Sequence, residues 1–107
     1  MATKQSTIDY LLDQLSEVTN VSARKMFGEY ALYCQGKVVG LVCDDELFVK
    51  ITGPGKKFVG KKYKEGFAYK GAKASMYISG DLFDDRQFLA ELISITVAAL
   101  PLPKPKK

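Results

Sequence analysis

The side chains of this chain that could carry covalent chemistry are two thiols, Cys34 and Cys43. The 107 residues contain no histidine and no tryptophan. Histidine is the most frequent general base and metal ligand, and two cysteines alone do not complete a structural zinc site. Because no histidine is present to activate either thiol, a thiol-dependent enzyme is a less favoured hypothesis. The composition predicts a protein without catalytic residues, metal or cofactor.

Two groups of carboxylates could serve acid–base or metal-assisted chemistry. They are the run Asp44-Asp45-Glu46 and the set Asp81, Asp84 and Asp85. The first group fits a turn between strands, and the second fits the start of a helix, where negative charge is favourable. Structural roles explain both groups, so a carboxylate-dependent enzyme is also the less favoured hypothesis.

A lysine-rich segment separates two acidic ones. Residues 52–80 hold seven lysines and one glutamate, a net charge of +6 in a chain whose total is +4. The candidate contacts to nucleic acid or another anion are Lys56, Lys57, Lys61, Lys62, Lys64, Lys70 and Lys73. Such a density suits an anionic partner, but arginine, which binds phosphate and guanine in bidentate fashion, occurs only twice. A solvated surface is the favoured interpretation, and a nucleic-acid-associated module is the alternative.

The spacing of apolar residues predicts helices at both ends of the chain and strands between them. Ser6 precedes apolar residues that recur every three or four positions, which predicts an amphipathic helix ending near Asn20. Asp84, with Gln87 at the reciprocal position of a capping box, predicts the start of a closing helix that Pro101 limits. The strands expected between these helices are residues 24–27, 30–34, 38–43 and 46–51, followed, after a short helix over 56–63, by residues 67–69 and 74–78. This order predicts an α+β domain with an antiparallel meander flanked by helices.

Two-residue turns at Gln35-Gly36 and Asp44-Asp45 set the register of the predicted meander. The first turn places Cys34 opposite Lys37, and Cys43 lies six residues further along the same strand. At about 3.3 Å per residue the two sulfur atoms are roughly 20 Å apart, beyond the reach of a disulfide. We therefore expect both thiols to stay reduced.

Length and composition predict one hydrophobic core. Apolar residues make up 47% and charged residues 26% of the chain, as in soluble globular domains. No apolar run approaches the ~20 residues that cross a bilayer, and the first residues lack the apolar stretch of a signal peptide. We expect a cytoplasmic protein without membrane contact, one domain over residues 1–100, and an extended tail rich in proline and lysine over residues 101–107.

Several segments resemble, in the same order, the N-terminal domain of the TfoX/Sxy family. The resemblance is carried first by the run from Arg24 to Gly28, which contains Met-Phe-Gly, and by the strand that follows it. It continues through the acidic turn at Asp44-Asp45 to the closing helix and spans about residues 7–100. The positions that match the family motif are Arg24, Met26, Phe27, Gly28, Tyr33, Gly36, Leu47, Lys50, Tyr69, Met76 and Tyr77. Glu29 and Ala31 stand where members often carry glycine.

The resemblance implies a small α+β fold and offers no catalytic residues to carry over. Full-length relatives promote natural competence by helping the cyclic-AMP receptor protein to activate promoters, and they carry a second, helical C-terminal domain. We expect this chain to be a stand-alone N-terminal domain that acts as a non-enzymatic regulatory or protein-interaction module, linked to competence or transcription regulation. Its expected partner is a protein, while nucleic-acid binding and homodimer formation through a sheet edge stay open as alternatives.

Overall fold

The computed structural model describes residues 3–26, 29–68 and 70–100. The family-motif positions Phe27, Gly28 and Tyr69, the side chain of Met26 and the predicted tail over 101–107 lie outside the described part. The expectations that concern them therefore stay predictions.

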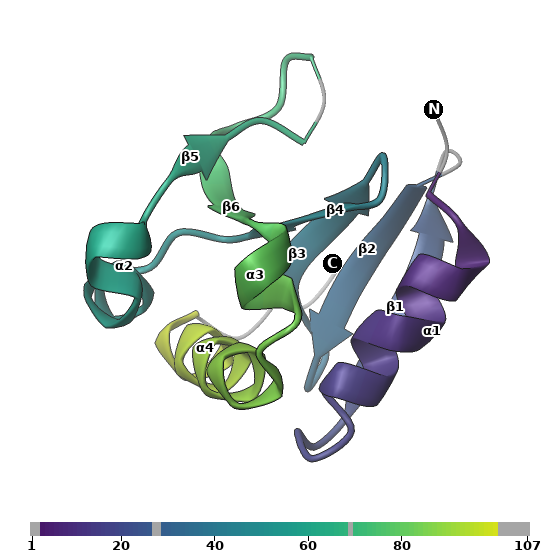
Figure 1. Ribbon diagram of the computed structural model, residues 1–107, viewed down its shortest axis with the longest axis horizontal. Coiled ribbons are helices and arrows are strands. Elements are labelled where there is room, and N and C mark those ends of the chain that lie inside the picture. Colours follow the sequence, from purple (N-terminus) through teal and green to yellow (C-terminus); the bar gives the residue numbers. More distant parts are fainter. Residues whose placement is uncertain (1–2, 27–28, 69, 101–107) are drawn as a thin grey trace, which may run out of the picture.

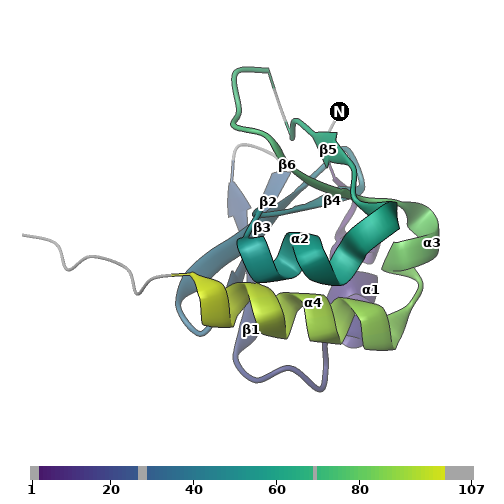
Figure 2. The same ribbon diagram turned by 90° about the vertical axis from the view of Figure 1, so that its left-hand side faces the viewer.

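Within the described residues the chain forms a six-stranded antiparallel sheet and helices that lie on one side of it (Figures 1 and 2). The elements are α1 (Gln5–Gln14), β1 (Val21–Met26), β2 (Glu29–Cys34), β3 (Lys37–Cys43), β4 (Glu46–Val49), α2 (Gly53–Val59), the 3₁₀ helix η1 (Gly60–Lys62), β5 (Glu65–Gly66), β6 (Ser75–Ile78), α3 (Gly80–Phe83) and α4 (Arg86–Ala99). The strand order is β1-β2-β3-β4-β6-β5. The predicted α+β class and its antiparallel meander are confirmed.

The two long helices do not start at the predicted N-cap residues. The N-cap of α1 is Lys4 rather than Ser6, and that of α4 is Asp85 rather than Asp84. Ser6 does not cap α1, because the helix already begins at Gln5. Its N-cap residue is Lys4, whose side chain makes no capping hydrogen bond. Instead, the Asp45 carboxylate in the β3–β4 turn accepts hydrogen bonds from the backbone N–H of Lys4 at 2.9 Å and from Thr7 Oγ1 at 2.8 Å. A carboxylate that is distant in sequence thus caps the N-terminus of α1, at the positive end of the helix dipole.

The end of α1 and the start of α4 also differ from the sequence prediction. The first helix ends at Gln14 rather than near Asn20, which has a positive φ of 60° in the following loop. Asp85, not Asp84, is the N-cap of α4, and its carboxylate accepts a hydrogen bond from the Phe88 N–H at 3.0 Å. Asp84 ends α3, a short helix that the sequence pattern did not predict.

The second strand pair begins earlier than predicted. The strand expected at residues 67–69 is displaced to β5 (Glu65–Gly66), whereas the strand expected at 74–78 is found as β6. The N–H of Tyr77 donates to the carbonyl of Lys64 at 2.8 Å, so pairing with β6 starts directly after η1. The short helix expected over 56–63 begins at Gly53, because the Thr52 hydroxyl caps it by accepting from the Gly55 N–H.

Both predicted two-residue turns are confirmed. Gln35 and Gly36 have φ values of 52° and 80°, and Asp44 and Asp45 have 53° and 63°. Positive φ at both central residues is the signature of the hairpin turn whose twist matches that of the flanking strands. The first turn pairs Cys34 with Lys37, as its length predicts.

One face of the sheet packs against the helices to form the core. On the sheet side the core consists of Tyr30, Leu32, Cys34, Val39, Val42, Leu47, Val49, Met76 and Ile78. On the helix side it consists of Ile8, Leu11, Leu15, Val59, Leu82, Phe83, Leu89, Leu92, Ile93 and Val97. Because side chains alternate along a strand, the other half of each strand points to the opposite face, which carries no helix.

An irregularity in the β2–β3 register turns the start of β3. Leu32 pairs with Gly40 but Tyr33 pairs with Val38, so Val39 is the extra residue of a β-bulge. The bulge directs Lys37 toward the helices, where its Nζ donates to the carbonyl oxygens of Val97 at 2.9 Å and Leu100 at 2.8 Å. A lysine of the sheet therefore binds the carbonyl end of α4.

Candidate functional site

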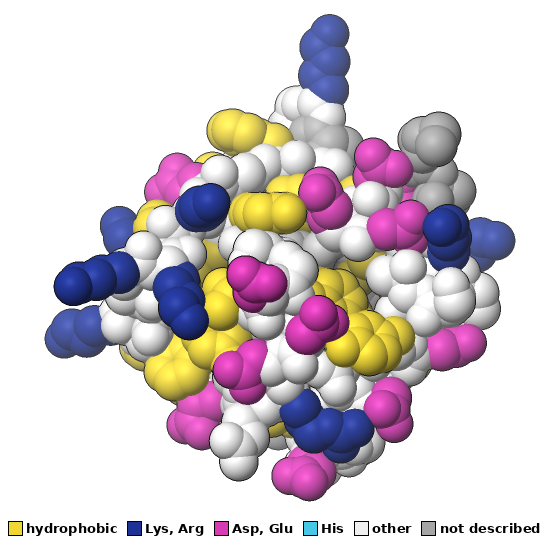
Figure 3. All heavy atoms as spheres, in the orientation of Figure 1, with side chains coloured by type: hydrophobic (Ala, Val, Ile, Leu, Met, Phe, Trp, Pro, Cys, Tyr) yellow, Lys and Arg dark blue, Asp and Glu magenta, His cyan; other side chains and the backbone are white. Residues whose placement is uncertain are grey.

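The seven candidate lysines are all exposed, but the fold divides them. Lys56 and Lys57 lie on α2, Lys61 and Lys62 on η1, and Lys64 directly before β5, whereas Lys70 and Lys73 lie in the loop between β5 and β6. Figure 3 shows cationic side chains gathered on its left side, where Figure 1 places α2. In the described part of the chain the one ion pair joins Arg86 to Asp13, so none of the seven pairs with a described carboxylate.

The α2 side of the molecule contains a shallow hollow of about 310 Å³. Its lining includes Lys61, Lys62 and Lys64 together with Tyr77, Ser79 and Asp81. Burial raises the pKa of the Tyr77 phenol, and the nearby Glu46 carboxylate raises it further. The hollow gathers three cations, but Asp81 places a carboxylate among them, which weakens the attraction for an anion.

The two thiols are poorly suited to nucleophilic chemistry. Both cysteines are buried and free, as predicted from the register. Burial raises the pKa of the Cys34 thiol, which donates a weak hydrogen bond to the Thr19 carbonyl at 3.5 Å. Burial, followed by the Glu29 and Asp44 carboxylates, raises the pKa of the Cys43 thiol. Both effects disfavour the thiolate, which is the nucleophilic form.

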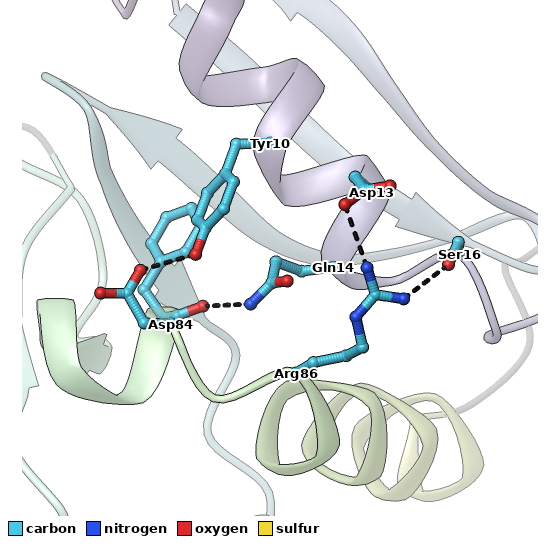
Figure 4. Close-up of polar contacts among 7 residues, drawn as sticks. Tyr10, Asp13, Gln14, Ser16, Asp84 and Arg86 are labelled. Carbon is cyan, nitrogen blue, oxygen red and sulfur yellow. Dashed lines mark hydrogen bonds and ion pairs between the residues drawn. The ribbon is translucent and has the colours of Figure 1, made fainter.

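The second carboxylate group connects α1 to α3 and α4 (Figure 4). The Tyr10 hydroxyl donates to Asp84 at 2.7 Å, and this hydrogen bond raises the pKa of the phenol because it stabilises the protonated form. Arg86 donates to the Asp13 carboxylate at 3.0 Å and to the Ser16 hydroxyl at 3.1 Å. The contact of Asp84 joins α1 to the end of α3, which supports the structural role predicted for this carboxylate, whereas Asp81 lines the hollow described above.

The first carboxylate group connects the N-terminal segment to the β3–β4 turn. Asp45 holds the start of α1, and those hydrogen bonds lower the pKa of its carboxyl group. Glu29, which the sequence analysis noted only as a departure from the family, accepts from Thr3 and from the Asp44 N–H at 3.1 Å. Among the described residues, no three His, Cys, Asp or Glu side chains lie close enough together to hold a metal ion.

The open face of the sheet, opposite the helices, is a further candidate interaction surface. Cross-strand pairing places five residues in one row across β1, β2, β3, β4 and β6: Arg24, Ala31, Leu41, Phe48 and Tyr77. The Phe48 and Tyr77 rings lie 5.7 Å apart. At the β1 end of this face the Arg24 guanidinium lies 5.4 Å from the centre of the Tyr33 ring.

The described family-motif positions lie in four kinds of place. Leu47 and Met76 are buried in the core, and Gly36 occupies the β2–β3 turn. Arg24, Tyr33 and Tyr77 lie on the open face, and Lys50 is exposed just after β4. The sequence alone could not distinguish these roles, because the face of the sheet to which a side chain points depends on the register of the paired strands.

No described helix is long and apolar enough to cross a membrane.

Comparison with known proteins supplies the family. A relative from Spirochaeta aurantia, described as an uncharacterized 12.7 kDa protein in the trpE 5′ region, is 38% identical over 107 residues, which cover 100% of this chain and 91% of the relative. Residues 13–100 match the TfoX N-terminal domain. The resemblance carried by the Met-Phe-Gly run and the strands after it is confirmed, and the chain belongs to the TfoX N-terminal domain family.

Proposed function

We propose that this domain is a non-enzymatic module that binds another protein through the open face of its sheet and thereby takes part in regulation, of competence or of transcription. The observation that carries the proposal is the asymmetry of the sheet. Helices cover one face, whereas no described helix covers the other. That face carries the exposed Arg24 and the half-buried Tyr33, Leu41 and Tyr77, beside the buried Ala31 and Phe48. Aromatic residues and arginine are enriched where proteins bind one another.

The chemistry of the described residues supports a binding role over a catalytic one. Both thiols are buried, with raised pKa values. Asp45 and Asp84 accept hydrogen bonds that join structural elements, and Asp85 caps α4. A catalytic site requires several reactive groups around one cavity, and Asp81 is the one member of these groups that lines the hollow beside Lys61 and Lys62.

The test is affinity capture from the source bacterium with three matched baits. The wild-type chain is compared with an open-face variant, Arg24→Glu with Tyr33→Ser, and with a control on α2, Lys57→Glu with Phe58→Ser. The control makes the same change in charge and removes a ring that is likewise partly exposed. Circular dichroism checks that all three fold.

We expect a protein that the wild type and the control retain and the open-face variant loses. The purified partner should then bind the open-face variant at least about tenfold more weakly, because loss of an interface anchor costs 1–2 kcal/mol or more. Equal retention of every captured protein by both variants would exclude this face as the binding surface.

A second candidate function is association with nucleic acid along the α2 side. It is favoured by one observation, the exposure of Lys56, Lys57, Lys61, Lys62 and Lys64 without an ion pair to a described carboxylate. Fluorescence anisotropy with single- and double-stranded oligonucleotides across a salt series tests it. Replacing Lys61 and Lys62 by Gln should lower the slope of log affinity against log salt by about 1.5, while the same change at Lys4 and Lys25 should not. No binding at low salt would remove this candidate.

A further inference from the structure

The open side of the sheet contains a second hollow, of about 630 Å³. It lies beyond Val49 and Met76, the last pair that joins β4 to β6 at this end. Its lining consists of Val38, Gly40 and Leu41 from β3, Lys50 and Ile51 after β4, residues 71–75 at the end of the β5–β6 loop, and Leu100 after α4. Four segments of the chain therefore surround one space.

The walls of this hollow are mostly apolar and incompletely buried. Val38, Leu41, Ala72, Ala74 and Leu100 are half-buried. Ile51 is 37% exposed, one of the few large apolar side chains with so much surface in the described part of the chain. The volume lies within the range of sites that hold small organic molecules, and such sites combine apolar walls with a few polar groups. The hollow, which is open to solvent, offers apolar walls to the body of a small ligand.

The charged groups of the hollow are both cationic. Lys50 and Lys73 line it, and its lining contains no aspartate or glutamate. Neither lysine forms an ion pair with a carboxylate among the residues described. A lysine ammonium attracts a carboxylate or phosphate as a point charge. This hollow thus differs from the one on the α2 side, where Asp81 lies among the lysines.

We propose that this hollow binds a small amphipathic carboxylate, an organic acid whose acyl body contacts the apolar walls and whose charged end contacts Lys50 and Lys73. The residues after Leu100 are a less suitable occupant, because Lys104, Lys106 and Lys107 would bring like charge to these lysines. A nucleic-acid strand is also less suitable, because no aromatic side chain lines the hollow to stack a base. The site goes beyond the proposed function, since this chain alone would hold the ligand.

The experiment is a titration of the isotope-labelled chain followed by NMR, with decanoate, decanol and decylamine as probes. The three probes share one apolar body and differ in the charge of the end group. Decanoate, kept below its micelle concentration, should shift the amide resonances of the lining residues and bind more tightly than the other two. Replacing Ala72 by Phe, which fills the hollow, should abolish those shifts.

A pair of charge-reversed variants separates a site from general attraction. Lys50→Glu with Lys73→Glu should weaken decanoate binding about tenfold, since two attractive contacts become repulsive. Lys57→Glu with Lys61→Glu makes the same change in net charge on the α2 side and should change the affinity less than about twofold.

Three outcomes would overturn the ligand site: no shifts with decanoate, equal binding of decanol, or equal weakening by both charge-reversed pairs. The two tests can be told apart because the open-face variant changes Arg24 and Tyr33, neither of which lines this hollow, although Tyr33 pairs with Val38, which does. If both proposals hold, the open-face variant loses the protein partner and still binds decanoate as tightly as the wild type.

Discussion

The contact between Lys37 and the end of α4 offers a quantitative test of the fold. The Nζ atom donates to two carbonyl oxygens, of Val97 at 2.9 Å and Leu100 at 2.8 Å, and links β3 to the last turn of the helix 60 residues later. We consider Lys37→Met, which keeps an unbranched side chain of similar length over the same surface but removes the ammonium group.

The magnitude follows from the two hydrogen bonds and the entropy of the lysine. A hydrogen bond to a charged group contributes about 1.5–3 kcal/mol, and ordering a lysine side chain costs up to about 2 kcal/mol. Both bonds are partly buried, and water can replace the ammonium at the freed carbonyl groups. We therefore expect Lys37→Met to lower the free energy of unfolding by about 1.5 kcal/mol, a fall in Tm of about 6–12 °C for a domain of this size.

Urea denaturation followed by circular dichroism measures this free energy. Lys57→Met on exposed α2 is the matched control and should change it by less than about 0.5 kcal/mol, while Lys37→Arg should retain most of the stability. The slope of the unfolding free energy against urea concentration should stay unchanged, because the variant alters no large buried surface. A Lys37→Met protein as stable as the wild type would show that the contact contributes nothing to stability.

Three further predictions concern packing, pH and thiol chemistry. Gly40→Ala should destabilise the fold by about 2–3 kcal/mol in the same urea assay, because the added Cβ would lie 2.4 Å from a backbone carbonyl oxygen of the neighbouring strand, whereas Gly53→Ala has no atom within 4 Å to meet. Folding lowers the pKa of Asp45 below 3.8, so the stability that its carboxylate supplies is present above the unfolded pKa and is lost as the pH falls through the folded pKa. Between pH 6 and pH 2 an Asp45→Asn variant should therefore lose less stability than the wild type. Parallel losses in the two proteins would contradict the assigned hydrogen bonds. Cys34 and Cys43 should react with a disulfide reagent at pH 8 far more slowly in the native chain than in urea, since burial raises both pKa values; rapid labelling of the native protein would refute this.

Features that depend on neighbouring residues were predictable from the sequence. The turn at Gln35-Gly36 needs positive φ at two successive positions, and the residue types and the turn length together specify the pairing of Cys34 with Lys37. Apolar periodicity of three and four residues likewise identified the two long helices, and the reduced state of the thiols followed from strand length alone.

The tertiary structure decided which group performs each role. Asp45 rather than Ser6 holds the start of α1, because a carboxylate from a turn some 40 residues away accepts hydrogen bonds from Lys4 and Thr7. The lysine-rich segment is continuous in sequence, but the chain carries Lys61 to the α2 side and Lys73 to the other hollow. Which side chains share a face depends on the pairing of all the strands and on the bulge at Val39, which the residue types alone do not specify.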